Sequence, residues 1–115
     1  MDDNQLLEAL KAVAHPSRLT ILQALSRGEL NVGEIEEATD IGQPTLSQQL
    51  AILRKAGLVE TRRQAKLVYY SLDAHAIGTL GRAFSDMAPA SALAETEQGG
   101  RRPASGVANF ARLHI

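Results

Sequence analysis

A run of uncharged polar side chains in the middle of the chain has the chemistry needed to read the edges of base pairs. Leucines recur there at i, i+4 and i+7 (Leu46, Leu50 and Leu53), which predicts an amphipathic helix with one face against a core. The other face carries amides and hydroxyls instead of mixed Glu/Lys pairs: Gln43, Thr45, Ser47, Gln48 and Gln49. Such groups can recognise bases in a major groove. We interpret this face as a DNA-reading surface, with an ordinary solvated face as the alternative.

The residues before this face predict the first half of a helix-turn-helix. Residues 32–39 are expected to form a short amphipathic helix with Ile35 and Ala38 on its inner side. The turn that follows contains Gly42, which tolerates backbone angles that other residues resist. The reading helix is then expected to begin at Gln43, with Pro44 in its first turn, where a missing N–H costs nothing.

The residues after the reading helix predict a basic β-hairpin. Gly57 is expected to end the helix, and two β-prone runs follow within residues 58–72. Arg62, Arg63 and Lys66 lie near the turn between these runs, so together with Arg54 they are candidates for contacts with phosphate. The fold class expected is therefore mainly α with a two-stranded β-hairpin, a winged helix-turn-helix.

Several motifs in a fixed order resemble the ArsR/SmtB repressors. They are Ala14-His15-Pro16-Ser17-Arg18-Leu19, Val32-Gly33-Glu34-Ile35, Leu46-Ser47-Gln48-Gln49-Leu50, Leu53-Arg54-Lys55-Ala56-Gly57-Leu58-Val59 and Val68-Tyr69-Tyr70-Ser71-Leu72, within residues 5–87. The resemblance implies a homodimeric winged-helix repressor that occupies double-stranded operator DNA until a signal releases it. It also implies that His15 and Arg18 belong to the fold and not to a ligand site. Members of this family often have Ser at position 44 and His at position 49, so the base preference of relatives does not transfer to Pro44 and Gln49.

The first and last helices are expected to form the dimer interface. The first, residues 4–14, has an apolar side made by Leu6, Leu7, Leu10, Val13 and Ala14. Asp73 is expected to cap a last helix that runs to about Met87. From these helices we assign the interface residues Leu6, Leu10, Ile77, Leu80, Phe84 and Met87. The alternative for the last helix is that its apolar stripe covers the core of its own chain.

The net charge of −1 hides an uneven distribution. Residues 1–40 carry 8 acidic and 3 basic groups (net −5), residues 41–70 carry 1 and 5 (net +4), and residues 71–115 carry 4 of each. A basic central segment on an acidic body orients a protein on a duplex. The length of 115 residues and the 44% hydrophobic content predict one domain, residues 1–88. The Pro- and Gly-interrupted residues 89–115 predict a flexible tail, in which Arg101-Arg102 could reach phosphate and residues 107–115 could form a short helix.

The sequence predicts no metal site and no cofactor. Cysteine is absent, which removes thiolate ligands and thiol redox chemistry. In the resembled family, metal-sensing members carry ligands at positions that here are Asn31, Gly33, Ala74, Ala76, Met87 and Ala90. Asp73 and His75 lie one residue out of register, and a weak site made by them with His114 is the alternative.

The function expected is a sequence-specific DNA-binding repressor of its own or a neighbouring operon. A winged-helix protein interaction module that does not bind DNA is the alternative. An enzyme is not expected, since there is no Ser/His/Asp set and no phosphate-binding glycine loop. Regulation by a small organic effector, by a protein partner or the tail, or by no ligand remains open. Without a signal peptide or an apolar run of about 20 residues, a cytoplasmic protein that contacts no membrane is expected.

Overall fold

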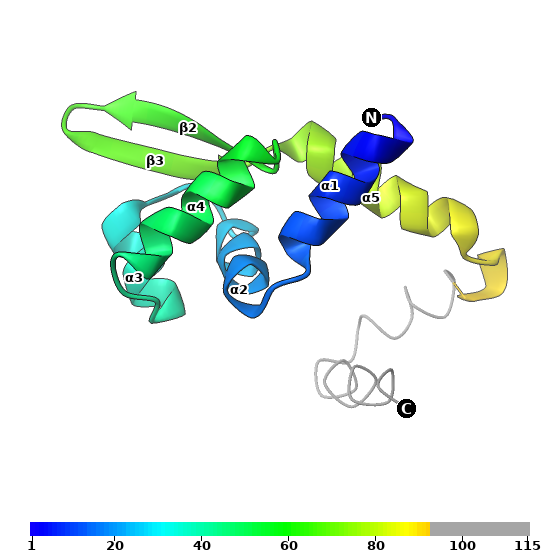
Figure 1. Ribbon diagram of the computed structural model, residues 1–115, viewed down its shortest axis with the longest axis horizontal. Coiled ribbons are helices and arrows are strands. Elements are labelled where there is room, and N and C mark those ends of the chain that lie inside the picture. Colours follow the sequence, from blue (N-terminus) through cyan, green and yellow to red (C-terminus); the bar gives the residue numbers. More distant parts are fainter. Residues whose placement is uncertain (93–115) are drawn as a thin grey trace. The chain divides into compact units, whose positions relative to one another are not determined.

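Helices and a small antiparallel sheet make up residues 1–92, the part of the chain that the computed structural model describes. The chain divides into two units, residues 1–80 and a second that begins at Gly81. The elements, in order, are α1 (Asp3–Val13), α2 (Pro16–Leu25), β1 (Leu30–Asn31), α3 (Val32–Thr39), α4 (Thr45–Lys55), β2 (Val59–Gln64), β3 (Leu67–Leu72) and α5 (Ala74–Met87) (Figure 1). This is the expected mainly α fold with a hairpin.

The leucine stripe of α4 is the centre of the core of the first unit. Leu46, Leu50 and Leu53 are at most 1% exposed, as the spacing predicts. They pack in one cluster with Ile21 of α2 and Ile35 of α3. Burial of each such side chain contributes about 1.5–3 kcal/mol. The stripe therefore fixes the rotation of α4 and turns its polar face outward.

The buried side of α1 differs from the prediction. Ala9 and Ala12 are the buried residues of this helix, whereas Leu7 is 54% exposed and Leu6 and Leu10 are only partly buried. Small side chains let α1 approach its neighbours closely, so the larger leucines lie at the margin of the contact. A hydrophobic pattern alone does not identify this buried side, because alanine contributes little to such a pattern.

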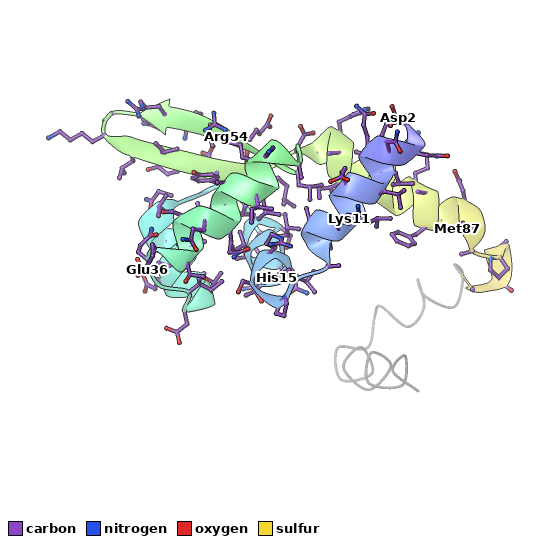
Figure 2. All side chains as sticks on the ribbon, viewed as in Figure 1. Asp2, Lys11, His15, Glu36, Arg54 and Met87 are labelled. Carbon is purple, nitrogen blue, oxygen red and sulfur yellow. The ribbon has the colours of Figure 1, made fainter. Side chains whose placement is uncertain are left out.

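Polar side chains cap the N-termini of several helices. His15 is the N-cap of α2, at the junction with α1, and its Nδ1 accepts the N–H of Ser17 at 3.2 Å (Figure 2). This confirms a structural role for His15. Asn31 and Glu34 form a reciprocal capping box at the start of α3, which satisfies two backbone donors that a helix leaves free.

The turn before α4 departs from the prediction in two ways. Asp40, not Gly42, occupies the left-handed region, with φ of 58°. A short polar side chain tolerates this conformation better than most. The helix begins at Thr45 rather than Gln43, and Pro44 stands at its N-cap position after a cis peptide bond. Ala38, expected on the inner side of α3, is exposed.

Gly57 ends α4, as expected. Its φ is 78°, and the N–H groups of Gly57 and Leu58 bond the carbonyls of Arg54 and Leu53 at 3.0 and 3.1 Å. These two bonds form a Schellman motif, which favours glycine at its left-handed position. The motif directs Leu58, which is fully buried, into the core at the start of β2.

The sheet contains a strand that the sequence did not predict. Its order is β1-β3-β2, and all pairs are antiparallel. β1 pairs only with Tyr69 and Tyr70 of β3, so the hairpin beyond that row is two-stranded. The turn at Ala65-Lys66 places Ala65 in the left-handed region, with φ of 56°. A two-residue strand is too short to show a period, which explains why β1 was missed.

α5 begins as expected and crosses the boundary between the two units. The carboxylate of Asp73 accepts the N–H of Ala76 at 3.0 Å, and the helix ends at Met87. In the first unit Leu80 is 8% exposed and belongs to the core, and its assignment to the dimer interface stays a prediction. In the second unit Phe84 and Met87 are 55% and 73% exposed. The stripe thus covers its own chain in its first half and is exposed in its second.

The predictions for Arg101-Arg102, residues 107–115 and His114 lie outside the described residues. The proposed boundary at residues 88 and 89 stays a prediction.

Candidate nucleic-acid interface

The outward face of α4 presents the polar groups that the sequence singled out. Thr45, Ser47 and Gln48 are exposed, and the buried leucines on the opposite side hold them outward. Arg54 is exposed in the last turn, beside the hairpin (Figure 2). These groups can donate to and accept from base edges or phosphate oxygens.

Gln43, the residue before Pro44, caps the N-terminus of α4 with its side chain. Its Oε1 accepts the backbone N–H of Ser47 at 3.1 Å and the Ser47 hydroxyl at 2.7 Å. Pro44, at the cap position, has no side-chain group for this purpose. Because the carbonyl oxygen is used within the protein, the amide NH2 of Gln43 is the group left to donate outward.

Gln49 is tied to the body of the protein by Arg18. The Arg18 guanidinium donates through Nη1 to Gln49 Oε1 at 2.8 Å, and through Nε and Nη2 to the carbonyls of Ala12 and Lys11 at 2.6 and 3.5 Å. Arg18 therefore joins the C-terminal end of α1 to the reading helix. Gln49 is partly buried, and its NH2 is its remaining hydrogen-bonding group. The sequence marked Arg18 as a fold residue but gave no indication of its partners.

The three basic residues of the hairpin differ in their surroundings. Arg63 and Lys66 are exposed and have no side-chain partner among residues 1–92. Arg62 instead pairs with Glu29, at 2.6 Å from Nη2 to Oε1 and 3.0 Å from Nε to Oε2. The hydrogen bonds from Arg62 hold the pKa of Glu29 below its ordinary value, and those to Glu29 raise the pKa of Arg62. Only two of the three cations are thus available without breaking an ion pair.

An open groove of about 450 Å³ connects α4 with the sheet. Ser47, Arg54 and Lys55 line it from the helix, and Tyr70 lines it from β3. One residue of the polar face, Ser47, and one residue of the sheet, Tyr70, therefore line the same groove. Residues 41–70, which contain both, carry a net charge of +4.

A family described as "Bacterial regulatory protein, arsR family" matches residues 15–61. The solved structure of the transcriptional repressor BigR from Xylella fastidiosa is 42% identical, with a TM-score of 0.61 over 75% of this chain and 89% of that one. The chain belongs to the arsR family. The matched residues include α2, α3, α4 and the start of β2. They therefore contain the helix-turn-helix described above.

Two curated relatives show how far the likeness extends. A "Biofilm growth-associated repressor" of Agrobacterium fabrum is 57% identical over 63 residues, 55% of this chain and 54% of that protein. The "Transcriptional activator HlyU" of Vibrio cholerae is 49% identical over 63 residues, 55% of this chain and 58% of that protein. The matched segment thus spans little more than half the length of these relatives.

The described residues bring no candidate metal ligands together in a cluster. Within residues 1–92 no group of three or more His, Cys, Asp or Glu side chains converges. Asp73 uses a carboxylate oxygen to cap α5, and His75 is exposed. No helix among the described residues has the length and apolar character to span a bilayer.

Proposed function

We propose that this chain is a sequence-specific DNA-binding transcriptional regulator that acts as a homodimer. The observation that carries the proposal is the exposed amide and hydroxyl face of α4 beside a hairpin with unpaired basic residues. The relatives are named as a repressor and an activator of transcription, which supports regulation of transcription. Repression is proposed because the relative with the higher identity is a repressor. Such a protein acts in the cytoplasm, where bacterial operators lie.

The residues divide into two roles. The N-terminal half of α4 enters the major groove, where Thr45, Ser47 and Gln48 contact base edges and the amide groups of Gln43 and Gln49 act as donors. The phosphate contacts come from Arg54, Arg63 and Lys66, which are exposed cations at the edges of that surface.

Base reading can be tested with a duplex selected from a random library. Gln48→Ala is expected to weaken binding to the selected duplex by about 1–3 kcal/mol while leaving the affinity for scrambled DNA unchanged. Gln23→Ala is the matched control, because Gln23 is an exposed glutamine on α2, away from the reading helix. Equal affinity of the wild type for selected and scrambled duplexes would support the protein interaction module and overturn the proposal.

Dimerisation through α1 and α5 is the second part of the proposal. Phe84 and Met87 on α5 and Leu7 on α1 are large apolar side chains that are more than half exposed, and a partner copy would remove them from water. Sedimentation is expected to show a dimer for the wild type and monomers for Phe84→Ser/Met87→Ser. Ile52→Ser, at a 41% exposed apolar residue of α4, is the control and should remain dimeric. A monomeric wild type would contradict this part.

A further inference from the structure

At one row of the sheet the basic hairpin passes from a three-stranded part to a two-stranded part. Asn31 of β1, Tyr69 of β3 and Arg62 of β2 lie side by side in the register. Towards the tip, β2 and β3 pair only with each other. A two-stranded ribbon without further support is marginally stable and twists freely. The orientation of Arg63 and Lys66 therefore depends on what holds the hairpin at this row.

Arg62 makes a clamp across the sheet at this point. Because Arg62 and Tyr69 are direct cross-strand partners, their side chains share a face, and the guanidinium carbon lies 4.9 Å from the centre of the tyrosine ring. The guanidinium continues to Glu29, directly before β1, where it makes two hydrogen bonds. It also donates to Gln64 at 2.7 Å. The side chain thus links one edge of the sheet to the other.

The geometry also separates Arg62 from its basic neighbours. Successive side chains of a strand point to opposite faces, so Arg63 lies on the face of its partner Val68 and of Tyr70, which borders the groove beside α4. Arg62 lies on the other face, with its charge balanced by Glu29. A phosphate would have to displace a bidentate carboxylate to reach it.

We propose that Arg62 is a positioning residue of the DNA-binding surface and not a phosphate ligand. With Glu29 and Tyr69 it sets the angle of the hairpin, and the phosphate contacts fall to Arg63 and Lys66. Glu29 is then a residue of the binding surface although it carries the same sign of charge as DNA. This inference rests on the proposed function and assigns separate tasks to adjacent arginines.

Glu29→Ala gives the sharpest test, because the two accounts predict opposite signs. If only charge matters, removal of an acidic group strengthens binding to DNA. If the clamp positions the hairpin, Glu29→Ala weakens binding several-fold. Glu37→Ala, which removes an exposed carboxylate of α3 without a side-chain partner among the described residues, is the matched control. Affinity is measured by fluorescence anisotropy on a duplex selected by the wild type.

Salt dependence supplies the second readout. Arg63→Ala removes one phosphate contact per chain, two per dimer, and should reduce the slope of log K against log salt by about 2. Arg62→Ala should lower affinity with an unchanged slope, and Glu29→Ala/Arg62→Ala should bind no more weakly than either single variant. Exchange of the pair, Glu29→Arg/Arg62→Glu, should restore part of the affinity.

Tighter binding by Glu29→Ala, or a smaller slope for Arg62→Ala, would overturn the inference and leave the proposed function intact. Failure of the wild type to select any duplex would instead overturn both. A Glu29→Ala variant that loses affinity while Glu37→Ala does not would support the clamp.

Discussion

Replacement of Arg18 by alanine should destabilise the first unit, because this side chain joins the end of α1 to α4. Two short charge-assisted bonds would be lost, from Nε to the Ala12 carbonyl at 2.6 Å and from Nη1 to Gln49 at 2.8 Å. The third, to Lys11 at 3.5 Å, is too long to add much. Hydrogen bonds to charged groups contribute about 1.5–3 kcal/mol. Since Arg18 is only partly buried and water screens both bonds, we expect a total loss of about 2 kcal/mol, which is within the range for one such bond.

Urea unfolding followed by circular dichroism measures this loss, at one fixed protein concentration because a dimer unfolds in a concentration-dependent way. Arg27→Ala is the matched control: Arg27 is exposed after α2 and should change stability by less than about 0.5 kcal/mol. Arg18→Lys should be intermediate, because an ammonium cannot reproduce the fork of the guanidinium. If Arg18→Ala were no more destabilising than Arg27→Ala, the hydrogen bonds of Arg18 between α1 and α4 would contribute nothing measurable to the free energy of unfolding.

Three other predictions concern single groups. Ala65→Gly should raise the free energy of unfolding by up to about 1 kcal/mol, because a non-glycine residue at φ of 56° costs about 1–2 kcal/mol and the added chain entropy of glycine offsets part of the gain; a lower urea midpoint would contradict it. Gln43→Ala should cost about 1 kcal/mol, since the two bonds to Ser47 at the start of α4 are lost, and thermal unfolding measures it. The Glu29 carboxyl should titrate below its ordinary value of 4.5 by NMR and return towards it in Arg62→Ala. Because the folded pKa is lowered, the stability that this pair contributes is present above pH 4.5 and is lost as the pH falls through the folded pKa; a Glu29 pKa unchanged by Arg62→Ala would argue against the ion pair.

Local patterns predicted the parts of the fold that depend on neighbouring residues. The spacing of Leu46, Leu50 and Leu53 was sufficient to orient α4, because helix period alone decides which side meets a core. Gly57 and Asp73 were identified as helix ends from residue type, and the structure gives both the expected bonds. Such features need only a few residues of context.

The partners of the site residues lie too far away along the chain for such local patterns to identify them. Glu29 is 33 positions from Arg62, and Arg18 is 31 positions from Gln49. Residue types near the hairpin tip therefore indicated three equivalent cations, although one of them is paired from across the sheet. The buried alanines of α1 were missed for a related reason, since close approach between helices is decided by the neighbour and not by the hydrophobicity of the helix itself.

The most direct test of the DNA-binding surface is the salt dependence of binding to a selected duplex. In the proposed homodimer, Arg54, Arg63 and Lys66 provide three cations per chain and six in total, so the slope of log K against log salt should be about −5. Arg63→Ala/Lys66→Ala should reduce it to about −2 while the preference for the selected duplex over a scrambled one remains. A slope that this double variant leaves unchanged, or no preference for the selected duplex in the wild type, would contradict the assignment of the α4 face and the hairpin to DNA.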